Sequence, residues 1–244
     1  MAKIKPLKKK EPLDPETALT VWQQTVAYVH DNIRQIGALA LIGAVVIVAL
    51  SGWMVSRNRA EQEALSLFSQ ALAMMEKIGE KQGDNATTYE AALEKFKTVH
   101  QQHPSTKAGK AALFYSGVCY FHLKKYDEAI TSYKNFLDSS GSTLPYLKAF
   151  TYEGLGYAHE MKNQYAEAIT WFERQKQEGS GALSGTTLLN LARCYEAQGD
   201  KARACTLYQE FLEKQPNSSF KDLAKLKTAT VCTKAPAATE APKS

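Results

Sequence analysis

The chain has 244 residues, of which 23% are charged, and contains 14 glycines, 8 prolines and 4 cysteines. This composition excludes collagen-like and wholly disordered chains, and four cysteines without CxxC spacing are too few for a disulfide scaffold. The net charge is +5, but residues 60–233 carry 20 basic and 20 acidic side chains, so the excess lies towards the two ends. A domain with equal numbers of basic and acidic side chains argues against nucleic-acid binding, which requires a basic face.

The N-terminal segment predicts two regions before any apolar stretch. Residues 1–15 hold five lysines and three prolines, which is typical of a basic disordered tail. In residues 16–35, Trp22, Val26, Val29 and Ile33 recur on one helical face. This pattern predicts an amphipathic helix lying at a membrane interface, with Trp22 and Tyr28 in the headgroup zone.

The stretch 36–55, IGALALIGAVVIVALSGWMV, contains no charged residue. A helix of this length spans roughly 30 Å, the thickness of a bilayer's hydrocarbon core. The alternatives are a buried core helix and a secretory signal. A core helix this apolar on all sides is uncommon in a small domain, and a signal usually has a shorter apolar region with a small-residue cleavage site. We therefore expect a transmembrane helix over 36–56.

The cationic residues predict the orientation of this helix. Six of them precede the span, whereas only Arg57 and Arg59 follow it closely. The positive-inside rule then places the N-terminus in the cytoplasm and the rest of the chain outside. For a Gram-negative bacterium, this means a single-pass inner-membrane protein with a periplasmic domain.

After the span, one pattern occurs four times: an alanine followed four residues later by an aromatic side chain. The alanines are 37, 39 and 36 residues apart and are Ala92, Ala129, Ala168 and Ala204. A small residue stands twelve positions before each of the last three, at Gly117, Gly156 and Ala192. Four matches in register favour a repeat array over a helical bundle with chance spacing.

This pattern resembles the tetratricopeptide repeat, a helix–turn–helix unit of 34 residues. The resemblance implies an all-α solenoid over 57–233, with Gly117 facing Ala129 where two helices touch and Tyr133 filling the space against the following helix. Residues 218–230 have no partner helix, and we expect them to close the array with one solvated face. Residues 234–244, rich in proline and alanine, predict a disordered tail.

No motif for catalysis or cofactor binding occurs in the chain. The sequence lacks HExxH, GxxxxGK[ST], GxGxxG and GxSxG patterns. His100 and His103 have a spacing that could bind a metal weakly, but their place before Pro104 favours solvated side chains. We expect no catalytic residue, no metal and no cofactor.

What remains is a binding surface. In tetratricopeptide arrays the first helix of each repeat lines the concave face, and the small-residue register assigns the groove to Phe114, Val118, Phe121, Phe150, Glu153, Tyr157, Leu189, Arg193 and Glu196. The grouped aromatics predict either a protein or peptide partner or a covering segment of the chain itself. The family's carboxylate-binding mode needs Lys and Asn where this chain has Phe, Val and Tyr, so that mode does not fit.

Two cysteines occupy related positions in the last repeat. Cys194 and Cys205 are equidistant from the turn near Gly199, so they are expected to face each other across the helix pair. Two readings stay open: a pair of buried thiols acting as small hydrophobes, or a disulfide formed in an oxidising compartment.

The whole layout resembles the ancillary subunit of the bacterial Sec translocon, which has a short cytoplasmic N-terminus, one membrane helix and a periplasmic tetratricopeptide domain. The resemblance implies a protein that holds or hands on client polypeptides beside the translocation channel, together with periplasmic chaperones. A structural scaffold for cell-wall or outer-membrane assembly is the alternative, and an enzyme built on a helical array is a third class.

Overall fold

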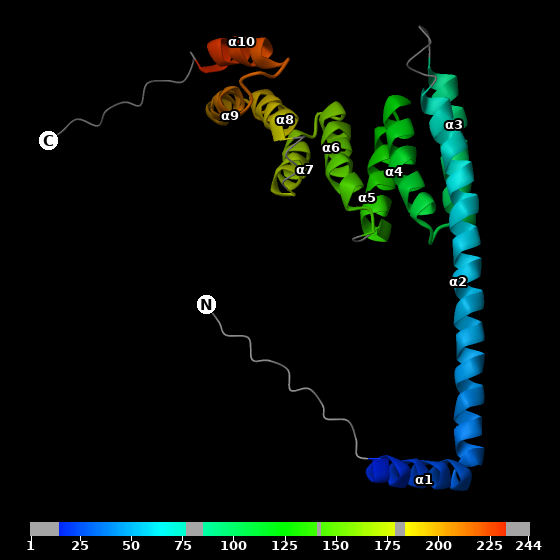
Figure 1. Ribbon diagram of the computed structural model, residues 1–244. Helices are drawn as coiled ribbons and strands as arrows, with labels where there is room; N and C mark the ends of the chain where they lie inside the picture. Colours follow the sequence, from blue (N-terminus) through cyan, green and yellow to red (C-terminus); the bar gives the residue numbers. More distant parts are fainter. Residues whose placement is uncertain (1–14, 77–84, 141–142, 179–183, 233–244) are drawn as a thin grey trace, which may run out of the picture. The chain divides into compact units, whose positions relative to one another are not determined.

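The computed structural model describes residues 15–76, 85–140, 143–178 and 184–232. These ranges form ten α-helices and no strand (Figure 1), which confirms the all-α prediction. The helices are α1 (Pro15–Asp31), α2 (Ile33–Glu76), α3 (Ala86–Gln102), α4 (Lys107–His122), α5 (Tyr126–Ser140), α6 (Pro145–Met161), α7 (Tyr165–Gln177), α8 (Ser184–Ala197), α9 (Lys201–Lys214) and α10 (Lys221–Val231). The contacts of the chain divide it into two compact units, Met1–Arg57 and Asn58–Ser244.

The first unit consists of α1 and the beginning of α2. The helix expected over 16–35 is interrupted at Asn32, whose side-chain amide donates a hydrogen bond to the Tyr28 carbonyl at 2.9 Å. The tails expected over 1–15 and 234–244 lie outside the described residues, except for Pro15.

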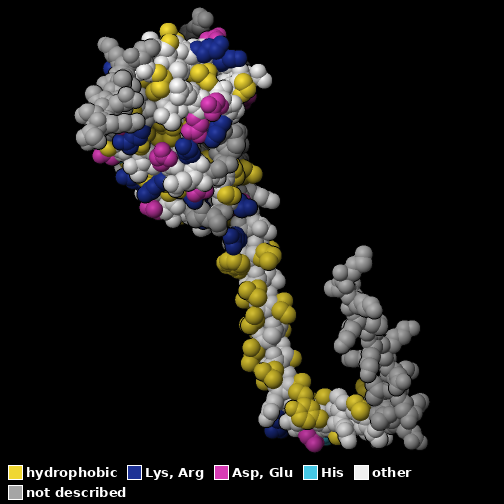
Figure 2. All heavy atoms as spheres, turned by 90° about the vertical axis from the view of Figure 1, so that its left-hand side faces the viewer, with side chains coloured by type: hydrophobic (Ala, Val, Ile, Leu, Met, Phe, Trp, Pro, Cys, Tyr) yellow, Lys and Arg dark blue, Asp and Glu magenta, His cyan; other side chains and the backbone are white. Residues whose placement is uncertain are grey.

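Helix α2 is long and apolar enough to cross a membrane. Its most apolar 18-residue window has a mean hydropathy of 2.4, and none of that window is buried. Hydrophobic side chains line the visible face of this part of the helix in Figure 2. This helix has the length and composition of a membrane anchor or of a signal sequence.

The C-terminal part of α2 is the first helix of the second unit. Ala64, Phe68 and Ala71 are buried there, and the Phe68 ring lies 5.5 Å from the ring of Phe96 and 5.3 Å from that of Tyr115. The sequence turns from an all-round apolar stretch to one apolar face after Arg59, which is the pattern of a helix packing on one side.

Three helix pairs follow as repeats, α4–α5, α6–α7 and α8–α9, with α3 before them and α10 after them (Figure 1). The small residues lie where the helices touch. A Cβ atom added to Gly117 or to Gly154 would come within 2.6 Å of the Tyr133 ring, so this ring fills the space between α4 and α6. The expected place of Tyr133 against the following helix is therefore confirmed.

The turns within the three repeats share one backbone feature. Lys124, Asn163 and Gly199 have positive φ angles of 60°, 59° and 84°, and each stands five residues before the motif alanine. A residue in the left-handed region commonly ends an α-helix, and glycine adopts it at the lowest cost. The repeat register read from the alanines thus matches the register of the turns.

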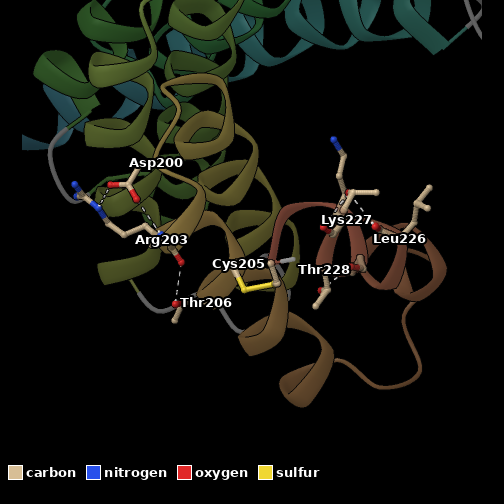
Figure 3. The surroundings of a disulfide bond; sticks show 11 residues. Asp200, Arg203, Cys205, Thr206, Leu226, Lys227 and Thr228 are labelled. Carbon is tan, nitrogen blue, oxygen red and sulfur yellow. Dashed lines mark hydrogen bonds and ion pairs between the residues drawn. A yellow bond between two sulfur atoms is a disulfide. The ribbon is translucent and has the colours of Figure 1, made fainter. Parts of the chain in front are cut away.

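Of the two readings left open for Cys194 and Cys205, a disulfide between them is contradicted by the structure. Cys205 bonds to Cys232 instead, with a Cα–Cα distance of 5.2 Å (Figure 3). Cys194 is a buried thiol. The position of α10 explains the difference, because this helix packs on α9 and carries Cys232 to the partly exposed Cys205. The expectation of a buried thiol holds for Cys194. Burial raises the pKa of this thiol to about 12.

Candidate functional site

A pocket of about 200 Å³ opens among the last helices of the array. Its lining comes from four helices: Tyr157 of α6; Thr186, Leu189, Asn190 and Arg193 of α8; Tyr208 of α9; and Leu223 and Lys227 of α10, with Phe220 just before α10. The antiparallel pairing of the repeats places α6 and α8 as the first helices of successive pairs, and the closing segment supplies the remaining wall.

The pocket has an apolar floor and an apolar rim. Leu189 is 9% exposed and belongs to the core, whereas Phe220 and Leu223 are 45% and 49% exposed. Half-exposed large side chains beside a hollow are the arrangement that favours burial of an apolar group from a partner.

One wall of the pocket is polar and internally hydrogen bonded. The Asn190 amide donates to the Tyr157 hydroxyl at 2.9 Å, and that hydroxyl lies 3.4 Å from a Glu153 carboxylate oxygen. Burial raises the pKa of Tyr157, and the neighbouring Glu153 raises it further. These groups orient one another, so the wall presents a fixed amide and phenol.

The charged side chains of the pocket are paired between helices. Arg193 binds Glu160 through two hydrogen bonds, Nε to Oε1 at 2.5 Å and Nη2 to Oε2 at 2.7 Å, and these bonds raise the pKa of the arginine. Lys227 Nζ lies 3.0 and 3.1 Å from the two carboxylate oxygens of Glu196.

Each pair joins neighbouring helices of the same face, α6 to α8 and α8 to α10. Since every cation of the pocket has a carboxylate partner, the site has no excess charge for capturing a free anion or a metal. Its chemistry suits an apolar side chain flanked by groups that hydrogen-bond.

The structure brings together some of the residues predicted for the groove. Tyr157, Leu189 and Arg193 line the pocket, and Glu153 contacts Tyr157. Phe121 lies next to them, with its ring centroid 6.5 Å from that of Tyr157. Glu196 lies at the edge, where it binds Lys227.

The remaining groove predictions fall elsewhere. Phe150 is 45% exposed and Val118 is partly buried, and neither lines the pocket. Phe114 is wrong as a residue of this pocket, because it is not among the lining residues and its ring packs against Tyr133 and Phe136 at 5.8 and 5.9 Å. It stands three residues before Gly117, so it shares the helix face that meets α5.

Sequence reasoning missed the α10 side of the pocket. Phe220, Leu223 and Lys227 recur at helical spacing on one face of the closing segment. That spacing was available as a signal, but the segment lacks the alanine motif that sets the register of the other helices. Asn190 and Tyr208 were missed as well.

The described ranges contain no group of three His, Cys, Asp or Glu side chains placed to hold a metal ion. The Nδ1 atom of His100 lies 3.0 Å from the Gly109 carbonyl oxygen, which gives this histidine a structural contact at the start of α4.

Comparison with known proteins supports the repeat assignment. The family model described as tetratricopeptide repeat matches residues 111–140 and 186–218. No curated protein matches the chain significantly.

Among solved structures, the chain is similar to the nearly identical TPR-like repeats of a putative kinesin light chain from Podospora anserina. The identity is 16%, the match covers 70% of this chain and 86% of that one, and the TM-score is 0.57. The MamA protein is similar at 17% identity, over 72% of this chain and 88% of that one, with a TM-score of 0.51. At such identities these likenesses concern the fold alone. The chain thus carries tetratricopeptide repeats in a tetratricopeptide-like fold.

Proposed function

We propose that this tetratricopeptide-repeat chain is a membrane-anchored module that binds segments of client polypeptides in the pocket formed by α6, α8, α9 and α10. Tetratricopeptide repeats mediate protein–protein interaction, so protein partners follow from the fold. The observation that carries the proposal is the pocket itself, in which Leu189 forms an apolar floor and Phe220 and Leu223 form a half-exposed rim.

The choice of an unfolded client follows from the chemistry of this pocket. Its apolar side chains can take a leucine-like or aromatic side chain, and burial of one such group contributes about 1.5–3 kcal/mol. The pairs Arg193–Glu160 and Lys227–Glu196 place both signs of charge at the edge, so no single client charge is selected. A site of this kind tolerates many sequences that expose apolar residues.

The location proposed is the bacterial inner membrane, with the N-terminus in the cytoplasm and the repeats in the periplasm. The apolar stretch of α2 and the cationic residues before it support this topology. The bond between Cys205 and Cys232 supports it independently, because disulfides persist in oxidising compartments such as the periplasm.

The proposed setting is the Sec translocon, where the protein holds or hands on emerging chains in the manner of a chaperone. The resemblance of the whole layout to the translocon's ancillary subunit supports this setting. The tetratricopeptide fold is generally a non-catalytic interaction scaffold, and we propose no enzymatic activity.

A scaffold for envelope assembly is the second candidate, because such a scaffold also uses periplasmic repeats. The two functions differ in the partner. A chaperone contacts many unfolded exported chains, whereas a scaffold contacts one folded partner in fixed stoichiometry.

Site-specific photo-cross-linking in intact cells separates these functions. A photoreactive phenylalanine analogue replaces Leu223 at the pocket rim or, as the matched control, Leu226 of the same helix, which is 62% exposed and does not line the pocket. We expect cross-links from position 223 to many newly exported chains and few from position 226. One dominant product from position 223, of constant stoichiometry, would favour the scaffold, and equal cross-linking at both positions would refute the pocket as the site.

A further inference from the structure

The closing helix α10 buries few of its own side chains. Only Ala224 and Val231 of its eleven residues are buried, whereas Leu223 and Leu226 are 49% and 62% exposed. Its preceding residue, Phe220, makes no side-chain capping hydrogen bond. A helix of this length is marginal in water by itself, so its position depends on its attachments.

Within the described residues, Ala224 and Val231 of α10 belong to the apolar core of the last helices. The helix packs on α9, Lys227 forms an ion pair with Glu196 of α8, and the disulfide joins Cys232, directly after α10, to Cys205 of α9. Figure 3 shows the disulfide on the α9 side of α10, with Lys227 and Leu226 on the same helix. Of these contacts the disulfide alone is covalent, and the ion pair is partly buried.

The pocket depends on this helix. Leu223 and Lys227 lie on it, and Phe220 directly precedes it. If α10 leaves α9, the pocket loses this wall and Leu189 becomes open to solvent.

We infer that the Cys205–Cys232 disulfide controls the assembly of the pocket, so that the site is formed in the oxidised chain and lost in the reduced chain. This inference rests on the proposed function, in which the same pocket receives client polypeptides. The chain is synthesised with reduced cysteines, so the pocket would form only after oxidation outside the cytoplasm.

The redox step is a thiol–disulfide exchange. A dithiol attacks the partly exposed disulfide, the sulfur–sulfur bond breaks, and each cysteine becomes a thiol with one electron and one proton gained, while the dithiol becomes a disulfide. Cys194 takes no part, since it is fully buried within the array.

Hydrogen–deuterium exchange of the full chain in detergent micelles tests this inference without a client. Peptides covering 218–232 report on α10, and peptides from α4 and α5 serve as an internal reference for the rest of the fold. The oxidised chain is compared with the same chain treated with dithiothreitol and then reoxidised.

We expect amide exchange in α10 to become at least tenfold faster on reduction, to return on reoxidation, and to leave α4 and α5 unchanged. The variant Cys205→Ala with Cys232→Ala is the matched control, expected to exchange rapidly in α10 with or without dithiothreitol. Unchanged exchange of α10 on reduction would overturn the inference.

A binding measurement on the same samples distinguishes the proposed client binding from the proposed control of the pocket by the disulfide. Fluorescent, reduced and carboxymethylated α-lactalbumin is the unfolded probe, and its binding to the oxidised chain tests the proposed function. Weaker binding on reduction, alongside faster α10 exchange, supports both. Faster exchange with binding unchanged would refute the pocket as the client site, although the disulfide would still control the pocket.

Discussion

The Glu61 carboxylate of α2 lies 2.9 Å from the backbone nitrogen of Lys107, the first residue of α4. Its second oxygen lies 3.2 Å from the nitrogen of Ala108. The helix that carries the apolar stretch therefore also supplies a capping group to the first complete repeat. Free N–H groups at a helix N-terminus favour such a negative charge.

We expect Glu61→Ala to destabilise the second unit by about 1 kcal/mol, the usual cost of losing a capping group. This corresponds to a fall of about 2–4 °C in the melting temperature of a domain of this size. Thermal unfolding of the full chain in micelles, followed by circular dichroism, measures the change. Glu63→Ala is the control because this exposed neighbour makes no such contact; equal melting of both variants would contradict the capping role.

Replacement of Lys124 by glycine is predicted to raise the stability of the chain. Lys124 adopts a φ angle of 60° at the position where Gly199 stands in the last repeat. A side chain in the left-handed region is strained, so Lys124→Gly should stabilise the chain by about 0.5–1 kcal/mol. The reciprocal variant Gly199→Ala should destabilise it by a similar amount, and the same melting experiment compares the two. A lower melting temperature for Lys124→Gly would show that the chain entropy lost by glycine outweighs the strain.

Glu153 should make stability depend on pH. Burial raises the pKa of its carboxyl above the ordinary value, so the folded state binds the proton more tightly than the unfolded state does. Its stabilising contribution is present below the ordinary pKa and is lost as the pH rises through the raised pKa. The variant Glu153→Gln keeps the shape and removes the charge.

We therefore expect Glu153→Gln to melt higher than the unaltered chain at pH 7 and to lose this advantage as the pH falls to 4. Glu173→Gln on α7 provides a control for the loss of one charge. A constant difference between the chains across this range would contradict the assigned effect of burial.

The positions of the helices in the repeats followed from the sequence. In each repeat, a small residue on the first helix lies against the second helix, which carries the motif alanine and, four residues later, an aromatic side chain. Tyr133, packed between Gly117 and Gly154, shows why this pattern is specific: the ring leaves no room for a Cβ atom at either glycine. The apolar helix was equally clear, since twenty uncharged residues leave few alternatives.

The sequence predicted some of the α6 and α8 residues of the candidate site but none of those from α9 and α10. Phe114, Glu153 and Leu189 occupy the same place, three residues before the small residue, and that helix face turns partly into the core. Both Leu189 and Phe114 are nearly buried, but Leu189 lines the pocket whereas the Phe114 ring packs against Tyr133 and Phe136 of α5. Which of these occurs depends on the neighbouring helices. The pairing of Cys205 with Cys232 was missed for a related reason, because the repeat pattern does not fix where the closing helix packs.

The proposed topology predicts that the repeats are open to protease from outside the inner membrane. Spheroplasts with an intact inner membrane should lose the repeat domain on treatment with protease, while a cytoplasmic marker survives. Protection of the repeats until the membrane is disrupted would reverse the orientation.

The most direct test of the central claim is the affinity of the full, oxidised chain for fluorescent, reduced and carboxymethylated α-lactalbumin. The double variant Phe220→Ala with Leu223→Ala removes the rim of the pocket, and Leu226→Ala removes an exposed side chain of the same helix outside it. We predict at least a tenfold loss of affinity for the double variant, as burial of one such side chain is worth about 1.5–3 kcal/mol, and no more than a twofold change for Leu226→Ala. Equal affinity of the double variant and the unaltered chain, with the melting temperature and α10 exchange unchanged, would contradict the account.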